Sequence, residues 1–402
     1  MVKINAKPRR GDIILVLTMT GTFPLSKFEN IQTPFYYYDT ELLRKTLELV
    51  KNQTQQYGYV AHYAVKANAN PAILKIIASY GLGADCVSGG EVQAAIDAGF
   101  NPANIVFAGV GKTDKEINLA LDQHIFCFNA ESIPELEVIN ELAEKKGITA
   151  NIAIRINPNV DAHTHHYITT GLNENKFGFN MEDLDKIITL LATLKNLKFI
   201  GIHFHIGSQI TDFSSFQDLC VRLNEIQDKL EQQGVAIQHI NVGGGLGINY
   251  EHPNHFPIAD FETYFRLFNQ NIRLREGQIL HCEPGRSVVA QCGSLVTRVT
   301  YVKNGTTKKF AIVDAGMTDL IRPALYQAYH RIENISSTLP EEEYDVVGPI
   351  CESADVFQKD VLLPQTKRGD FLVLRSAGAY GEIMASRYNM RNLPLGYLSE
   401  KL

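Results

Sequence analysis

A lysine, Lys66, ends a short apolar run within the segment Tyr63-Ala64-Val65-Lys66-Ala67-Asn68. An amine in such a position is partly removed from water, and we expect burial to lower its pKa and leave a neutral, nucleophilic form available. A lysine that merely ends a strand and reaches solvent is the plainer interpretation, and this feature alone favours it. Lys66 therefore becomes a candidate for covalent chemistry only together with residues elsewhere in the chain.

Two further segments with glycines follow apolar runs, and the second of them also carries charged residues. The first is Gly243-Gly244-Gly245, whose backbone N–H groups could close around a phosphate. The second is Glu283-Pro284-Gly285-Arg286, in which the planar fork of Arg286 suits a phosphate or a carboxylate. If Glu283 faced a pyridine nitrogen, it would keep that nitrogen protonated and make the ring a strong electron sink. Each segment could also be an ordinary tight turn or a surface ion pair.

A fourth segment, His203-Phe204-His205-Ile206-Gly207-Ser208-Gln209, offers imidazole and hydroxyl groups. We expect His203 and His205 to point to opposite sides, which argues against a shared metal ion. His205 could lie flat on a cofactor ring and Ser208 could donate to a phosphate, whereas His203 suits a core histidine with satisfied hydrogen bonds. The histidines of His163-Thr164-His165-His166 have no acidic or thiol cluster nearby, so we predict no metal site.

Eight short apolar runs alternate with helix-like segments in the first two thirds of the chain. Runs of this kind are typical of strands buried on both faces. Capping signals mark the helices between them, such as the pairs Ser88 and Glu91, Thr113 and Glu116, and Ser132 and Glu135. The expected strands are Tyr59–Val65, Gly83–Cys86, Ile105–Ala108, Ile125–Phe128, Asn151–Ile156, Phe199–His205, His239–Val242 and Ile279–Glu283.

This alternation predicts an α/β protein with a (β/α)8 TIM-like barrel, and a doubly wound open sheet is the alternative. In a barrel the carboxyl ends of the strands meet at one face, where active sites lie. The four segments described above would then come together, since each follows a different strand. One such coincidence carries little weight, but four favour a single site.

After the predicted barrel, the sequence shows mostly strand-like runs and few helical signals. The expected strands there are Ser294–Lys303, Lys309–Asp314, Tyr344–Val347, Asp360–Leu363 and Gly369–Leu374, with Asn304-Gly305 as a hairpin turn. Another strand, Phe35–Tyr38, precedes the barrel. We therefore expect a barrel over residues 41–285 and a mostly β second domain formed by residues 1–40 and 286–402.

Composition narrows the function classes. Of the 402 residues 45% are hydrophobic and 20% are charged, and the formal net charge is −6, so nothing indicates a nucleic-acid or membrane partner. The six cysteines form no Cys-x-x-Cys pair, which favours reduced thiols and a cytoplasmic protein. Lys7-Pro8-Arg9-Arg10 precedes an apolar stretch, Ile13 to Leu17, which is too short for a convincing secretory signal.

From Pro34 to about Tyr388 the sequence resembles the fold-type III pyridoxal-phosphate (PLP) decarboxylases, whose barrel is alanine-racemase-like. The motifs that carry the resemblance are the segments around Lys66, His205, Gly243–Gly245 and Glu283, with Cys351-Glu352-Ser353-Ala354-Asp355 and Gly378-Ala379-Tyr380-Gly381. The resemblance implies that Lys66 is the Schiff-base lysine, that His205 stacks on the PLP ring and that Glu283 pairs with its nitrogen. Residues implied to bind the phosphate are Ser208, Gly243, Gly244, Gly245, Gly285, Arg286 and Tyr380. Cys351 is implied to be the proton donor, reaching the site from a partner subunit of a homodimer with shared active sites.

Within that family the chain is most similar to the enzymes that convert meso-2,6-diaminopimelate to L-lysine and CO2. Such a substrate needs a fixed cation and a fixed anion for its far end. Arg322 would supply the cation, helped by Arg286 and the hydroxyls of Tyr326 and Tyr380, and Glu352 would supply the anion. Decarboxylases of ornithine, arginine or carboxynorspermidine remain alternatives, as does a regulatory homologue without catalysis. Glu283 argues against a racemase, and the presence of Lys66 and Cys351 argues against a silent homologue.

Overall fold

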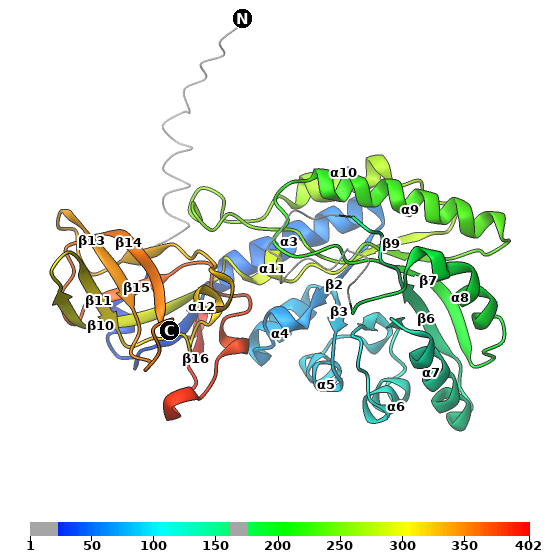
Figure 1. Cartoon of the computed structure of the whole chain (residues 1–402), viewed down its shortest axis with the longest axis horizontal. Coiled ribbons are helices and arrows are strands. Elements are labelled where there is room, and N and C mark those ends of the chain that lie inside the picture. Colours follow the sequence, from blue (N-terminus) through cyan, green and yellow to red (C-terminus); the bar gives the residue numbers. More distant parts are fainter. Residues whose placement is uncertain (1–22, 161–175) are drawn as a thin grey trace, which may run out of the picture.

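Eight parallel strands close into a barrel, as the computed structural model of residues 23–160 and 176–402 shows (Figure 1). The first and last strands pair directly, with Val60 opposite His281, so the barrel prediction is confirmed and the open sheet is excluded. The strands are β2 (Val60–Ala64), β3 (Gly83–Cys86), β4 (Ile105–Phe107), β5 (Cys127–Ala130), β6 (Ala150–Arg155), β7 (Leu197–His203), β8 (His239–Asn241) and β9 (Ile279–Cys282).

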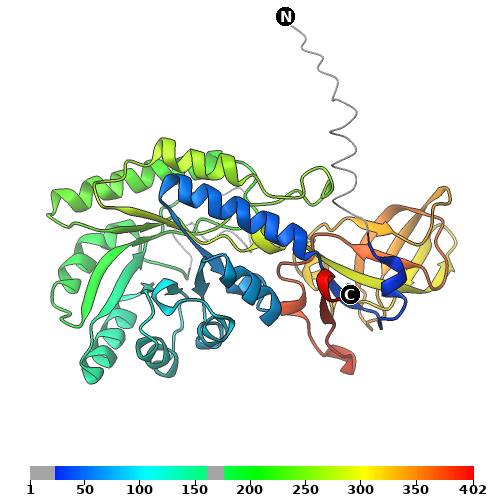
Figure 2. The same ribbon diagram turned by 180° about the vertical axis from the view of Figure 1, so that it is seen from behind.

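Helices surround the barrel on its outside, as both views show (Figures 1 and 2). They are α3 (Thr40–Tyr57), α4 (Pro71–Ser79), α5 (Gly89–Ala98), α6 (Asp114–Asp122), α7 (Ile133–Lys146), α8 (Leu184–Leu191), α9 (Ser214–Gln232) and α10 (Phe261–Asn271). All three predicted caps accept a hydrogen bond from the third helical residue, but only Thr113 and Glu116 form the reciprocal box. At the other two helices the glutamate instead accepts from the N–H of the residue before the cap. Glu91 accepts from Val87, and Glu135 accepts from Glu131.

Two barrel strands differ from their predicted limits by two residues at each end, and the others agree to within one residue. β5 begins at Cys127 and not at Ile125, because the N–H of Ile125 bonds to Ala120 at the end of α6. β7 ends at His203, so His205 lies in the connection that follows it. Apolar periodicity cannot locate these ends, since the apolar run continues through each of them.

A second, mostly antiparallel sheet follows the barrel in the chain. Its strands are β10 (Gly293–Asn304), β11 (Lys309–Val313), β12 (Ile332–Asn334), β13 (Glu341–Val347), β14 (Val356–Pro364) and β15 (Phe371–Leu374), in the order β12-β15-β10-β11-β13-β14. Two terminal strands extend it: β1 (Phe35–Tyr38) pairs with β10 and with β16 (Leu395–Leu398). The hairpin predicted at Asn304-Gly305 is present between β10 and β11, but its turn begins one residue later. Asn304 still pairs with Lys309, so residues 305–308 make the turn.

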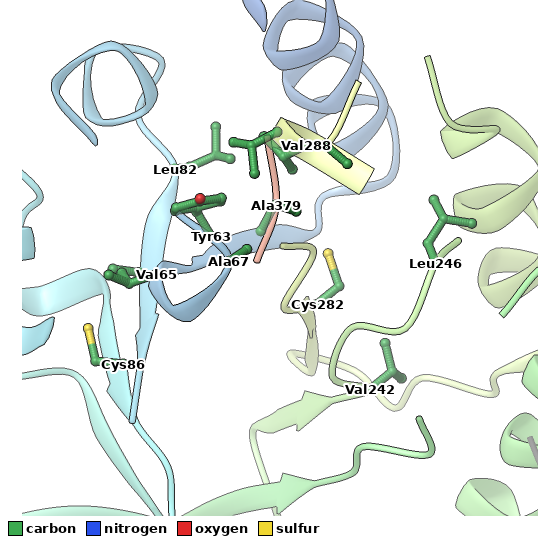
Figure 3. Close-up of a cluster of buried hydrophobic side chains, with 14 of the residues drawn as sticks. Tyr63, Val65, Ala67, Leu82, Cys86, Val242, Leu246, Cys282, Val288 and Ala379 are labelled. Atoms are coloured by element: carbon green, nitrogen blue, oxygen red, sulfur yellow. The ribbon is translucent and has the colours of Figure 1, made fainter. Parts of the chain in front are cut away.

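Buried apolar side chains fix the backbone on both sides of Lys66. Val65 and Ala67 are fully buried, and they pack with Tyr63 in a cluster that includes Val288 and Ala379 (Figure 3). The cluster joins the end of β2 to the start of α11 (Arg286–Val289) and to the segment after β15. The lysine is therefore carried by one of the most rigid parts of the molecule.

None of the helices in the described ranges has both the length and the apolar character needed to cross a bilayer. The segment Lys7 to Leu17, considered above for a secretory signal, lies outside the described residues.

Candidate active site

Lys66 lies in a 3-10 turn, η1 (Val65–Ala67), directly after β2, and its partner is an aspartate on the neighbouring strand. Nζ is 3.2 Å from Oδ2 of Asp85, a fully buried residue of β3. Burial alone would lower the pKa of Lys66, but the charges of Asp85, Tyr380 and Glu283 outweigh it and raise the pKa. The expected lowered pKa was therefore wrong. The only sequence signal for Asp85 was a charged residue inside the apolar strand Gly83–Cys86.

The turn that carries Lys66 is tied to the segment after β15. Asn68 donates from Nδ2 to the carbonyl of Gly378 at 2.8 Å, and the N–H of Tyr380 donates to the carbonyl of Ala67 at 2.8 Å. These bonds tie Tyr380 to the turn of Lys66, and Tyr380 is one of the groups that raise the pKa of the lysine.

Glu283 follows β9 inside the barrel and receives hydrogen bonds from three other strands. Oε1 accepts from Nδ2 of Asn241 at 2.6 Å and of Asn129 at 3.2 Å, while Oε2 lies 3.0 Å from Nε2 of His203. Burial by itself would raise the pKa of Glu283, but His203 and then Lys66 and His205 lower it below its usual value. The carboxylate is therefore ionised at neutral pH and can accept a further proton donor.

The two histidines of the fourth segment lie on the same side, so the expectation of opposite sides was wrong. Residues two apart share one face of a strand, and both His203 and His205 are near Glu283. Nδ1 of His205 accepts from the N–H of Gly244 at 3.3 Å, and burial followed by the charge of Lys66 lowers its pKa, which keeps the ring neutral. His203 is buried as expected, but its Nδ1 has no hydrogen-bond partner among the described residues.

The three glycines are required by close contact between strand ends. A Cβ on Gly243 would fall on the carbonyl oxygen of Phe204, and one on Gly244 would fall on that of Glu283. Gly243 and Gly245 also have φ angles of 71° and 106°, which favour glycine. The run therefore lies against His205 and Glu283, while its contact with a phosphate stays a prediction.

Two buried arginines lie on either side of a tyrosine hydroxyl. Arg286 donates from Nη2 to Ser208 Oγ at 2.9 Å and from Nη1 to Tyr250 Oη at 2.7 Å, and its guanidinium lies over the ring of Tyr380. Arg322, the first residue of α12 (Arg322–Tyr326), donates from Nη1 to the same Tyr250 oxygen at 2.8 Å. In residues 23–160 and 176–402 no carboxylate comes within ion-pair distance of either guanidinium. No motif in the sequence points to Tyr250.

The remaining predicted residues take different positions. Gly285 is closely packed, because a Cβ at this position would lie 2.9 Å from the Cβ of Ala64. Tyr326 lies close enough to Arg286 to help raise the pKa of the Arg286 guanidinium. Cys351 and Glu352 are exposed on the connection between β13 and β14, where they contact Asn389 and Tyr388. No hydrogen bond or ion pair joins either of them to Lys66, Glu283 or Arg322 in the described part of the chain.

The residues around Lys66 suit a phosphorylated pyridine aldehyde such as PLP. Three buried polar atoms there lack a hydrogen-bond partner within residues 23–160 and 176–402, namely Oδ1 of Asp85, Nδ1 of His203 and Nε of Arg286. A phosphate matches Arg286 and Ser208, a protonated ring nitrogen matches ionised Glu283, and an aldehyde matches the amine of Lys66. The donor set therefore fits the cofactor expected from sequence.

Among the described residues no group of three or more histidine, cysteine, aspartate or glutamate side chains is arranged to hold a metal ion. The histidines at 163, 165 and 166 lie outside those residues.

Comparison with known proteins gives consistent results. The family described as "Pyridoxal-dependent decarboxylase, pyridoxal binding domain" matches residues 41–290. A diaminopimelate decarboxylase of Bacteroides thetaiotaomicron is 63% identical over 385 residues, which is 96% of this chain and 100% of that protein. The structure of diaminopimelate decarboxylase from Helicobacter pylori complexed with L-lysine superposes with a TM-score of 0.89 at 40% identity, covering 94% of each chain. A lysine decarboxylase from Selenomonas ruminantium, 21% identical with a TM-score of 0.82 over 94% of this chain and 95% of that one, shares the fold.

Proposed function

Because this chain belongs to the pyridoxal-dependent decarboxylases and, within them, to the diaminopimelate decarboxylases, we propose that it converts meso-2,6-diaminopimelate to L-lysine and CO2 with PLP as cofactor. The observation that carries the proposal is the pair Arg286 and Arg322, two buried cations without a carboxylate partner in the described residues, beside the Lys66 and Glu283 group. A decarboxylase for a diamino acid with one carboxylate has no use for the second cation.

The cofactor-binding roles follow from the chemistry of each group. Lys66 would hold the aldehyde carbon and Glu283 the ring nitrogen, and the phosphate would be held by Ser208, Gly243, Gly244, Gly245, Gly285, Arg286 and Tyr380. When bound, PLP supplies an electron sink for the charge left on the α-carbon by the departing CO2. Ionised Glu283 keeps the ring nitrogen protonated, and the low pKa of His205 lets a neutral imidazole lie on the ring face.

Substrate choice rests on fixed charges. Arg322, with help from Arg286, Tyr326 and Tyr380, binds the carboxylate at the far end of the substrate, and Glu352 binds the far ammonium group. A ligand without that carboxylate leaves a buried guanidinium unpaired, and such mismatches reduce binding far more than a lost methylene group does. The residues therefore favour the diacid over ornithine, arginine or lysine.

We place the proton donor at Cys351 Sγ and assign it to the active site of a partner subunit. Cys351 is exposed, and among the described residues of its own chain it forms no hydrogen bond to Lys66, which supports a homodimer with shared sites. The division into a barrel over 41–285 and a second domain of residues 1–40 and 286–402 belongs to this proposal. The six cysteines are free, which supports the reducing cytoplasm as its compartment.

A substrate panel tests the proposed function. The protein is assayed for CO2 release from meso-diaminopimelate, L-ornithine, L-arginine, carboxynorspermidine and L-lysine, with and without added PLP. We expect PLP-dependent release from the diacid alone, with L-lysine as the second product. Release from a monoacid with none from diaminopimelate would exclude the assignment.

A further inference from the structure

Tyr250 lies in the connection between β8 and α10, a segment fastened to the loop that carries Ser208. The N–H of Ile210 donates to Gly245 and the N–H of Gly247 donates to Ile210, both at 2.9 Å. The side chain of Gln209 bonds both backbone groups of Ile248, at 2.7 and 3.2 Å. The phenol of Tyr250 and the hydroxyl of Ser208 are therefore positioned by one pair of interlocked loops.

The phenol oxygen receives one N–H from each of two guanidinium groups that come from different elements. The N–O distances are 2.7 Å to Arg286 and 2.8 Å to Arg322, whose side chains lie in residues only 6% and 5% exposed. Two donors fill both lone pairs of a neutral phenol, so its own O–H is free to turn toward an anionic ligand. Burial raises the pKa of Tyr250, but the two guanidinium groups outweigh burial and lower it.

A neutral histidine contacts the same nitrogen of Arg322 that donates to Tyr250. Nε2 of His330 lies 3.4 Å from Nη1 of Arg322, and Nδ1 lies 2.9 Å from the carbonyl oxygen of Arg375. Burial, followed by the charge of Arg322, lowers the pKa of His330 to about 3, so Nδ1–H donates to the carbonyl and Nε2 accepts. The imidazole also packs against the edge of the Tyr250 ring, with 5.2 Å between centroids. Arg322 is thus oriented by two acceptors that carry no full negative charge.

From this geometry we infer that Tyr250 is a positioning residue that joins the arginine of the cofactor phosphate to the arginine of the substrate's far carboxylate. The inference rests on the proposed function and adds to it a residue that links two binding subsites. A carboxylate at this place would orient both guanidinium groups but would cancel one of their two charges. A phenol orients them through one N–H each and leaves the charge of both for the ligands.

Tyr250→Phe tests the link, because it keeps the ring and its contact with His330 but removes the shared acceptor. We expect the dissociation constant of PLP from the apoprotein and the KM for meso-diaminopimelate each to rise about tenfold, as expected for a lost hydrogen bond to a charged group. We expect kcat to change less than about threefold, since the reacting atoms keep their partners. Pyridoxal, which lacks the phosphate, should bind both proteins equally.

Arg322→Lys provides a second and independent arm, because it keeps the charge but cannot hold Tyr250 in the same fork. Under the proposed function Arg322 contacts the substrate and not the phosphate. A loss of PLP affinity in this variant would therefore be transmitted by Tyr250, and the double variant should lose no more PLP affinity than Tyr250→Phe alone. Tyr59→Phe, a buried tyrosine of the core that is 8% exposed, is the matched control and should leave both constants unchanged.

The outcomes separate the two proposals. The link is overturned if Tyr250→Phe weakens only one ligand or neither, or if Arg322→Lys leaves PLP affinity at the wild-type value. If the wild-type protein binds PLP but releases no CO2 from meso-diaminopimelate, the proposed function fails, while the PLP measurements still decide the role of Tyr250. Should Tyr250→Phe not fold, the Arg322→Lys arm decides.

Discussion

Lys66 and Asp85 form an ion pair at the ends of neighbouring strands, and this pair controls when the lysine is nucleophilic. Asp85 is buried and holds the ammonium at 3.2 Å, so the lysine is charged at neutral pH. Only the neutral amine can attack an aldehyde. Under the proposed function, the protein therefore holds a cation at the position of its nucleophile, and removal of the proton would be part of cofactor loading.

In Asp85→Asn, the cofactor should attach to Lys66 at a lower pH than in the wild-type protein. Asp85 raises the pKa of Lys66, so its removal lowers that pKa, and the neutral amine becomes available at lower pH. The rate at which apoprotein acquires the absorbance of lysine-bound PLP, measured against pH, should show its midpoint shifted downward. Asp97→Asn, at an exposed aspartate of α5, is the control and should leave the profile unchanged. An unshifted profile for Asp85→Asn would show that the ion pair does not control the amine.

The sequence predicted site residues that lie in a recognisable local motif. It missed the residues that contact the site from neighbouring strands and loops. Lys66, Glu283 and Arg286 each end a run that predicts a strand end, and barrel geometry then brings them together. Asp85 and Tyr250 belong to the same site only because neighbouring segments pack side by side, which no local pattern records. The predicted direction of the Lys66 pKa shift was wrong for the same reason. The charge of Asp85, which raises this pKa, lies on another strand.

Among the elements, the connection between β13 and β14 is anchored by a buried carboxylate, that of Asp355. The carboxylate of Asp355 accepts the N–H of Met317 and that of Ile350, both at 2.6 Å. A Cβ on Gly348 would overlap that carboxylate, so the backbone closes directly on it. One side chain thus fixes the loop of Cys351 to the segment that leads into α12 and Arg322.

Asp355→Asn should loosen this loop, because an amide offers one acceptor oxygen where the carboxylate uses two. We expect kcat to fall about tenfold or more through misplacement of Cys351, with PLP affinity unchanged, since no phosphate-binding residue contacts Asp355. Asp360→Asn, in the exposed part of β14, is the matched control. An equal loss of PLP affinity would contradict a role confined to the loop.

The elements themselves were predicted better than their ends. Eight strands and the helices between them follow from apolar runs and caps. The end of β7 and the turn at residues 305–308 could not be predicted in this way, because each depends on which backbone groups pair across strands.

At the scale of the whole molecule, buried neutral histidines make stability depend on pH. The pKa of His330 falls to about 3 in the folded protein, against about 6.5 in an unfolded chain. The unfolded state therefore binds a proton that the folded state does not between these values, and this residue destabilises the fold as pH decreases below about 6.5. Lowered pKa values of His62, His281 and His239, which are hydrogen-bonded in a chain inside the barrel, act in the same direction.

His330→Gln should reduce this acid sensitivity. The contribution of His330 amounts to about 1.4 kcal/mol per pH unit below about 6.5, and glutamine cannot take up the proton. Denaturant unfolding at pH 7.5 and pH 5 should therefore give a smaller drop in the free energy of unfolding for the variant than for the wild type. The surface variant His255→Gln, at an exposed residue, should keep the wild-type drop. Equal drops for His330→Gln and wild type would show that His330 is not the source.

The proposed dimer predicts that two inactive variants complement each other. Lys66→Ala and Cys351→Ala remove groups that would act in the same active site from different subunits. When they are mixed, unfolded and refolded together, about a quarter of the sites should regain both groups, and activity should return to about that fraction of wild type. No recovery, despite mixed dimers detected by native mass spectrometry, would place both groups in one chain.

The position of the reactive amine is the claim on which every other role depends. Borohydride reduction of the PLP-loaded protein, followed by peptide mass spectrometry, locates the lysine that carries the cofactor. The account predicts the added mass on Lys66 alone, with none in Lys66→Ala. Modification of a different lysine in the wild-type protein, with Lys66 untouched, would contradict it.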